Sequence, residues 1–185
     1  MMDADDGDMS HLHRAFAPTR AFLAALAVAA ALLPAASARG QSVLLVVVEA
    51  ANSRPLPPPL PVREGLSATL FDAGCIVLDA PGASALPAPA EAARMARSAG
   101  ADVALEVSTE YSDTHLGTDR LRISARTTYA LIDMSTSGVL LRGTRTASNQ
   151  DREKDVGRAV LGAEIGRDVA QAIRDYLDRH PVRGG

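Results

Sequence analysis

The stretch that decides the fold is residues 121–131, LRISARTTYAL, in which apolar or small side chains alternate with polar ones. A period of two is typical of a β-strand with one buried and one solvated face. Residues 103–111 show the same alternation, and residues 139–147 show it in part. Turn-forming residues separate the three segments, at 115–117 and 135–138. We therefore expect a three-stranded antiparallel meander with one wet face.

Upstream of the meander, two short apolar runs predict strands that are buried on both faces. The first spans residues 42–50 and the second residues 75–78. Helices are expected from Pro61 or Val62 to about Asp72 and over 90–98, the latter ended by Gly100. The predicted order is β-α-β-α-β-β-β-α: a single α/β domain, in the form of a mixed α+β sheet of about five strands with helices packed on it.

The carboxyl-terminal region predicts a long amphipathic helix over residues 152–179. Three glycines interrupt it, Gly157, Gly162 and Gly166, and each lowers helix stability by about 1 kcal/mol relative to alanine. Tertiary packing must make up this loss, so we expect close contact between this helix and the sheet.

The first 38 residues are typical of an export signal. Arg14 and Arg20 precede an apolar run of 13 residues, 21–33, and Ala36-Ser37-Ala38 has the small-x-small pattern of a cleavage site. A membrane-spanning helix needs roughly 20 apolar residues, so we expect cleavage after Ala38 and no stable membrane anchor afterwards. The acidic prefix 3–8 indicates that Met9 is the true start. Residues 39–185 would then form one periplasmic domain.

The composition argues against nucleic-acid and charged-membrane partners and excludes an internal disulfide bond. The formal net charge is only −3, which argues against nucleic acid and against a strongly charged membrane surface. The single cysteine, Cys75, rules out an internal disulfide and is expected to be buried. The proline-rich segment 54–61 can be neither helix nor central strand, and we interpret it as a loop. Its role is left open between a stiff spacer and a recognition element.

No catalytic motif emerges from the sequence. Gly-x-Ser-x-Gly and the phosphate-binding glycine loops are missing, so we expect no enzyme activity and no cofactor. Asp113, His115 and Asp119 could bind a divalent cation if they converged. Because they lie at a predicted hairpin turn, where such residues are common, the turn interpretation is favoured and no metal site is expected.

Two features are candidate partner-binding surfaces. Opposite charges occur on neighbouring strands of the predicted wet face, where they would stabilise strand pairing by a few tenths of a kcal/mol or form a docking surface. These residues are Glu106, Glu110, Arg122, Arg126 and Arg142. The second feature is an apolar strip at Leu56 and Leu60 in the proline-rich segment.

The order of features from Glu91 to Ala147, together with Leu70–Asp79, resembles a group of envelope-assembly α/β domains. The resemblance rests on Gly100-Ala101-Asp102-Val103 before a strand, Leu131-Ile132-Asp133 at the end of another, and the turn with Thr136 and Gly138. The group includes the amino-terminal domain of TolB, the curli-secretion lipoprotein and the flagellar assembly protein T. The resemblance implies a non-enzymatic assembly module, often oligomeric, and brings no catalytic residues.

The sequence thus favours an exported interaction or scaffold module of a cell-envelope assembly, bound to an envelope protein or to itself. The alternative is a periplasmic accessory protein that binds a small ligand. That alternative requires a pocket into which polar groups converge.

Overall fold

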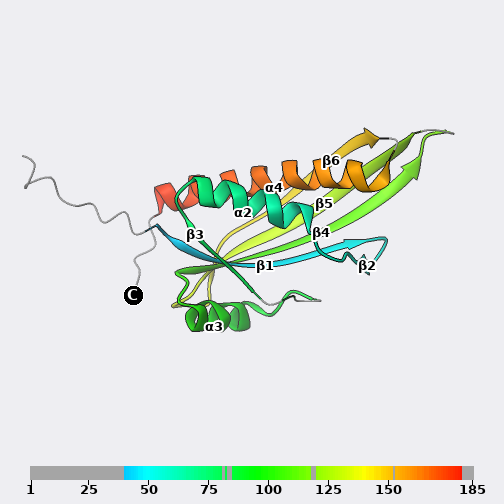
Figure 1. Ribbon diagram of the computed structural model, residues 1–185. Coiled ribbons are helices and arrows are strands. Elements are labelled where there is room, and N and C mark those ends of the chain that lie inside the picture. Colours follow the sequence, from blue (N-terminus) through cyan, green and yellow to red (C-terminus); the bar gives the residue numbers. More distant parts are fainter. Residues whose placement is uncertain (1–39, 81, 83–84, 118–119, 152, 181–185) are drawn as a thin grey trace, which may run out of the picture. The chain divides into compact units, whose positions relative to one another are not determined.

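The computed structural model describes residues 40–80, 82, 85–117, 120–151 and 153–180. The expected export signal, its cleavage site and Met9 lie outside these residues. The described part forms one mixed sheet with three helices, in the predicted order β-α-β-α-β-β-β-α (Figure 1). The fold class expected from the sequence is therefore confirmed.

Strand β1 (Ser42–Ala51) lies inside the sheet and pairs in parallel with β4 (Val103–His115). Strands β5 (Leu121–Asp133) and β6 (Val139–Asp151) complete the antiparallel meander predicted from the alternating segments. On its other side, β1 pairs in parallel with β3 (Ile76–Asp79). The described sheet order is β2-β1-β4-β5-β6, with β3 also beside β1.

The sheet has six strands where about five were expected. The additional strand, β2 (Arg54–Pro55), lies inside the segment predicted to be a loop and pairs antiparallel with Ala50 and Ala51. Proline lacks the amide donor, so such a strand is tolerated only at an edge. A turn at Asn52 and Ser53, both with positive φ (52° and 62°), joins it to β1, as a two-residue hairpin requires.

Helix α2 (Pro61–Asp72) begins at the last proline of the same segment, where the missing amide has no consequence. Helix α3 (Pro89–Ala99) also begins with proline and ends at Gly100, whose φ of 73° is the left-handed conformation that glycine adopts freely. Helix α4 (Lys154–Arg179) is the long amphipathic helix, starting two residues later than expected.

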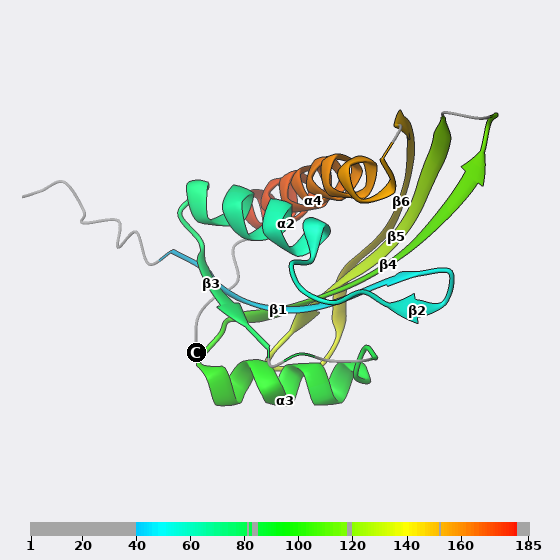
Figure 2. The same ribbon diagram turned by 45° about the vertical axis from the view of Figure 1, so that its right-hand side comes forward.

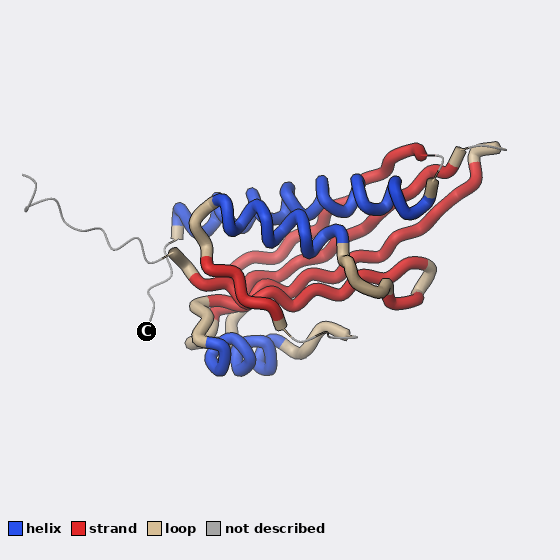
Figure 3. Tube along the Cα trace, in the orientation of Figure 1, coloured by secondary structure: helices blue, strands red, loops and turns tan. Residues whose placement is uncertain are grey.

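The helices divide the core into two parts. Helices α2 and α4 lie side by side on one face of the sheet, and α3 lies on the other (Figures 2 and 3). The larger core lies under α2 and α4 and includes Val43, Leu105 and Ile165, whereas the smaller lies under α3 and includes Leu44 and Ile132. Cys75 is half-buried beside the larger core. In the described part, no helix is long and apolar enough to span a membrane.

Helices α2 and α4 touch backbone to backbone, which corrects one sequence expectation. A Cβ atom on Gly65 would lie 2.5 Å from the carbonyl oxygen of Ala163, and one on Gly166 would lie 2.8 Å from the amide nitrogen of Leu66. Of the three glycines of α4, Gly157 faces the sheet as predicted, Gly162 lies against both Tyr111 of β4 and the start of α2, and Gly166 faces α2 alone. The packing that offsets their low helix propensity is therefore shared between the sheet and α2.

Candidate functional site

Helix α3 covers only one end of its face of the sheet and leaves the meander bare beyond it (Figures 1 and 2). The strand register places rows of hydroxyl and charged side chains there, which we call the polar face. Part of it forms an open depression of about 450 Å³ lined by Glu110, Arg126 and Thr146 among others. The polar face comprises Ser108, Glu110, Ser112, Ser124, Arg126, Thr128, Thr144, Thr146 and Ser148.

The structure brings together some of the charges predicted for this surface. Glu110 lies directly opposite Arg126, and its Oε1 also accepts a hydrogen bond from the amide of Ser53 at 2.7 Å. Arg122 lies on a different row, between Thr114 and Gln150. The polar face therefore carries one directly opposed charge pair, Glu110 and Arg126, among hydroxyl groups.

Glu106 differs from the other predicted site residues because only 6% of it is exposed. It shares a row with Ala130 and Arg142, and its Oε1 makes no hydrogen bond to any described residue. Burial raises the pKa of Glu106, and the positive charge of Arg142 opposes that rise. The expectation of a solvated carboxylate at this position was wrong, because neighbouring elements shield this part of the strand.

The pKa of Glu106 leads to a prediction about pH. A carboxyl group whose pKa is raised by folding stabilises the fold when protonated, and this contribution is lost as the pH rises through the folded-state pKa. Glu106→Gln should therefore become more stable relative to the wild type as the pH increases from about 4.5 to about 7. At the upper end we expect a gain of about 1 kcal/mol, since the glutamine carries no buried charge.

Urea unfolding at both pH values measures this difference. Glu110→Gln is the matched control, because Glu110 lies four positions along the same strand and is exposed. An equal pH response in the two variants would contradict the assignment of the effect to the burial of Glu106.

The predicted apolar strip at Leu56 and Leu60 is not an exposed surface. Leu56 is half-buried, packs against the larger core, and donates its amide to the carbonyl oxygen of Glu49 at 2.8 Å. Leu60 is also half-buried and immediately precedes α2. The proline-rich segment thus joins β2 to α2 with its leucines turned inward.

One of the candidate cation ligands, Asp113, is already paired with cationic side chains. Asp113 is engaged by Lys154 at 2.9 Å and by Arg158 at 3.3 Å, and it accepts a hydrogen bond from Asn52 at 3.2 Å. The hydrogen bond from Lys154 is the main cause of its lowered pKa. His115 is exposed at the end of β4, and Asp119 lies outside the described residues. Among the described residues, no group of three or more potential ligands could hold a metal ion.

A buried polar network that the sequence analysis missed connects β1, β4 and α2. Glu49 is 2% exposed; its Oε1 accepts hydrogen bonds from the amides of Val62 at 2.9 Å and Arg63 at 3.1 Å. The hydroxyl of Tyr111 donates to the other oxygen at 2.9 Å. Desolvation raises the pKa of both Glu49 and Tyr111. The sequence feature that could have indicated this network is a glutamate at an inward-facing position of an otherwise apolar strand.

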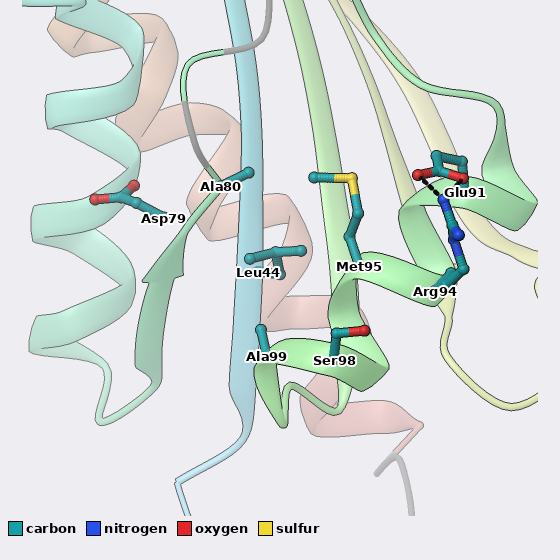
Figure 4. A pocket seen from close by; sticks show the side chains of 8 residues that line it. All are labelled: Leu44, Asp79, Ala80, Glu91, Arg94, Met95, Ser98 and Ala99. Atoms are coloured by element: carbon teal, nitrogen blue, oxygen red, sulfur yellow. Dashed lines mark hydrogen bonds and ion pairs between the residues drawn. The ribbon is translucent and has the colours of Figure 1, made fainter.

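A second pocket of about 450 Å³ lies between β1, the end of β3 and α3 (Figure 4). Its charged residues are already paired: Glu91 binds Arg94 at 2.6 Å, and Asp79 binds Arg63 of α2 at 2.6 Å. Its remaining lining side chains are Leu44, Ala80, Met95, Ser98 and Ala99. The pocket is therefore mainly apolar, with one hydroxyl group that no ion pair occupies.

Comparison with known proteins shows the fold and no family. No protein-family model matches the chain, and no curated protein matches it. Among solved structures, the PelC dodecamer from Paraburkholderia phytofirmans matches with a TM-score of 0.52 at 24% identity, covering 71% of this chain and 85% of that one. The hypothetical protein CT253 from Chlamydia trachomatis matches with a TM-score of 0.51 at 13% identity, covering 76% of this chain and 99% of that one.

A third solved structure, the lipoprotein GNA1162 from Neisseria meningitidis, matches more loosely, with a TM-score of 0.47 at 16% identity over 73% of this chain and 99% of that one. The chain thus shares its fold with PelC and CT253. The resemblance expected from the sequence is therefore confirmed at the level of the fold. A specific relation to TolB, the curli-secretion lipoprotein or the flagellar assembly protein T stays a prediction.

Proposed function

We propose that the chain is an exported, non-enzymatic interaction module of the bacterial cell envelope that works in a self-associated state. The observation that carries this proposal is the fold shared with PelC, a protein solved as a dodecamer. The export signal expected from residues 1–38 supports the envelope location. The polar face supports the interaction role, because it is a broad and accessible surface whose hydroxyl groups alternate with the buried side chains beneath.

A second candidate function, binding of a small ligand, is favoured by the pocket between β1, β3 and α3. Its volume of about 450 Å³ is in the range of small-molecule sites, roughly 300–1,000 Å³, and its lining is mainly apolar. It ranks below the first candidate because its charged groups pair with protein partners and leave only Ser98 to orient a ligand.

Native mass spectrometry separates the two functions. The full chain would be expressed with its own amino-terminal segment and recovered from the periplasmic fraction. Self-association predicts a defined multimer whose mass is a multiple of the bare subunit, and a monomer at micromolar concentration would overturn it.

Ligand binding instead predicts a constant added mass on each subunit. Ala99→Phe should then remove that mass, because Ala99 lines the pocket, whereas Ala90→Phe at the exposed start of α3 should retain it.

A further inference from the structure

Strand β6 is a long edge of the sheet, and no other described strand pairs with its outer side. It spans 13 residues, ends the described sheet, and pairs only with β5 among the described residues. An edge strand presents a row of backbone donors and acceptors to any chain that approaches it. Strand β6 is therefore the longest strand edge without a neighbouring strand in the part of the chain that the structure describes.

The sequence of β6 has few of the features that usually protect such an edge. Proteins prevent edge pairing with proline, charged side chains (lysine above all), bulges or very short strands. Strand β6 contains neither proline nor lysine, its positive charges are Arg142 and Arg145, and its one register irregularity lies at its start, opposite Leu131 and Ile132. The opposite side of the sheet has these features: β3 has four residues, and β2 has two, one of them Pro55.

We propose that β6 pairs antiparallel with β6 of a second copy of this chain, with Thr146 on the twofold axis. The inference rests on the proposed self-association and assigns a surface to it. The opposite edge is too short to pair along β6, so the described edge that matches β6 in length is β6 itself. A twofold contact of this kind joins the same surface on both subunits.

The side chains of β6 are self-complementary in this register. On the polar face, Thr146 lies opposite Thr146 of the partner subunit, and Thr144 lies opposite Ser148 of the partner subunit. Pairs of threonine and serine hydroxyls across strands contribute roughly 0.2–1 kcal/mol each. The hydroxyl groups thus favour the pairing in which the polar faces of both copies lie on the same side of one continuous sheet.

The charges of β6 are compatible with this register. Arg142 falls opposite Gln150 of the partner subunit, and Arg145 falls opposite Ala147 of the partner subunit, so no like charges face each other directly. Moving the twofold axis by one residue toward the start of β6 would set Arg145 against its own copy, which is destabilising. The arginines therefore exclude that register and are compatible with the one centred on Thr146.

Disulfide trapping tests the register. The native thiol is first removed with Cys75→Ser, and Thr146→Cys is then introduced into the full chain. Opposed residues of antiparallel strands have Cα atoms about 4.5–5.5 Å apart, within the range that a disulfide spans. We expect mild oxidation to yield at least ten times more covalent dimer from Thr146→Cys than from Thr128→Cys. The control residue is also an exposed threonine of the polar face, but it lies one strand inward.

A second pair of variants does not depend on oxidation. Thr146→Lys would oppose two ammonium groups across the axis and should weaken association at least tenfold, whereas Ala159→Lys, at an exposed position of α4 outside the polar face, should leave it unchanged. Equal trapping of the two cysteine variants in a protein that light scattering shows to be multimeric would overturn the β6 pairing and leave self-association standing. A monomer by light scattering would overturn both.

Discussion

Replacing Glu49 with leucine is expected to lower the free energy of unfolding by about 4 kcal/mol. The substitution removes the acceptor for three buried donors, the amides of Val62 and Arg63 and the hydroxyl of Tyr111, and leaves them without a partner. It also releases the first turn of α2 from β1. Leucine is similar in size and more apolar, so a loss of this size would reflect the hydrogen bonds and not the packing volume.

Chemical unfolding of three variants separates the contributions at this site. Tyr111→Phe removes one donor and should cost about 1 kcal/mol, because the carboxylate keeps its two amide partners. Glu64→Gln is the matched control, since Glu64 is exposed in the same helical turn and should change stability by less than about 0.5 kcal/mol. A Glu49→Leu protein as stable as the wild type would show that the network does not stabilise the fold.

The second large effect is expected at Gly166, where α4 crosses α2. In Gly166→Ala the new Cβ would meet the carbonyl oxygen of Val62 and would lie 2.8 Å from the amide nitrogen of Leu66. These are backbone atoms, so no rotation of a side chain relieves the contact and the helices must separate. Overpacking of this severity costs about 3 kcal/mol, and the better helix propensity of alanine returns about 1 kcal/mol, for a net loss of about 2 kcal/mol.

Thermal and urea unfolding measure this loss against Arg167→Ala, a control at the adjacent and exposed position of the same helix. The control changes helix propensity without entering the crossing. If Gly166→Ala were as stable as the control or more stable, the close approach of α2 and α4 would not be a tight constraint on the sequence.

The meander could be predicted from the sequence because its signal is local. The alternation in residues 121–131 reports the two faces of β5 directly, and the structure keeps every inward residue of that stretch at least half-buried. The ends of α2 and α3 could also be predicted from the sequence, since proline and glycine restrict or free the backbone at their own positions. These features depend only on residues that are close to one another in the sequence.

The features that were missed depend on residues far apart in the sequence. Glu49 accepts a hydrogen bond from Tyr111, which lies 62 positions later. The sequence around Glu49 does not indicate this partner. The burial of Glu106 depends on what lies over its strand, not on its own alternating pattern. The glycines of α4 could be read from the sequence. Their packing partner, a glycine-containing helix about a hundred residues earlier, could be identified only from the structure.

The parallel pairing at the centre of the sheet constrains how the chain acquires its structure. Val43 of β1 pairs with Val103 of β4, and hydrogen bonds at that end join residues 60 positions apart. As the polypeptide is made from its amino terminus, the edge of β1 that pairs with β4 therefore has no partner until β4 has followed, because β2 and β3 pair with the other edge of β1. During this interval the apolar run SVLLVVVEAA is exposed. That edge of β1 is therefore the part of the sheet most prone to pair wrongly before folding is complete.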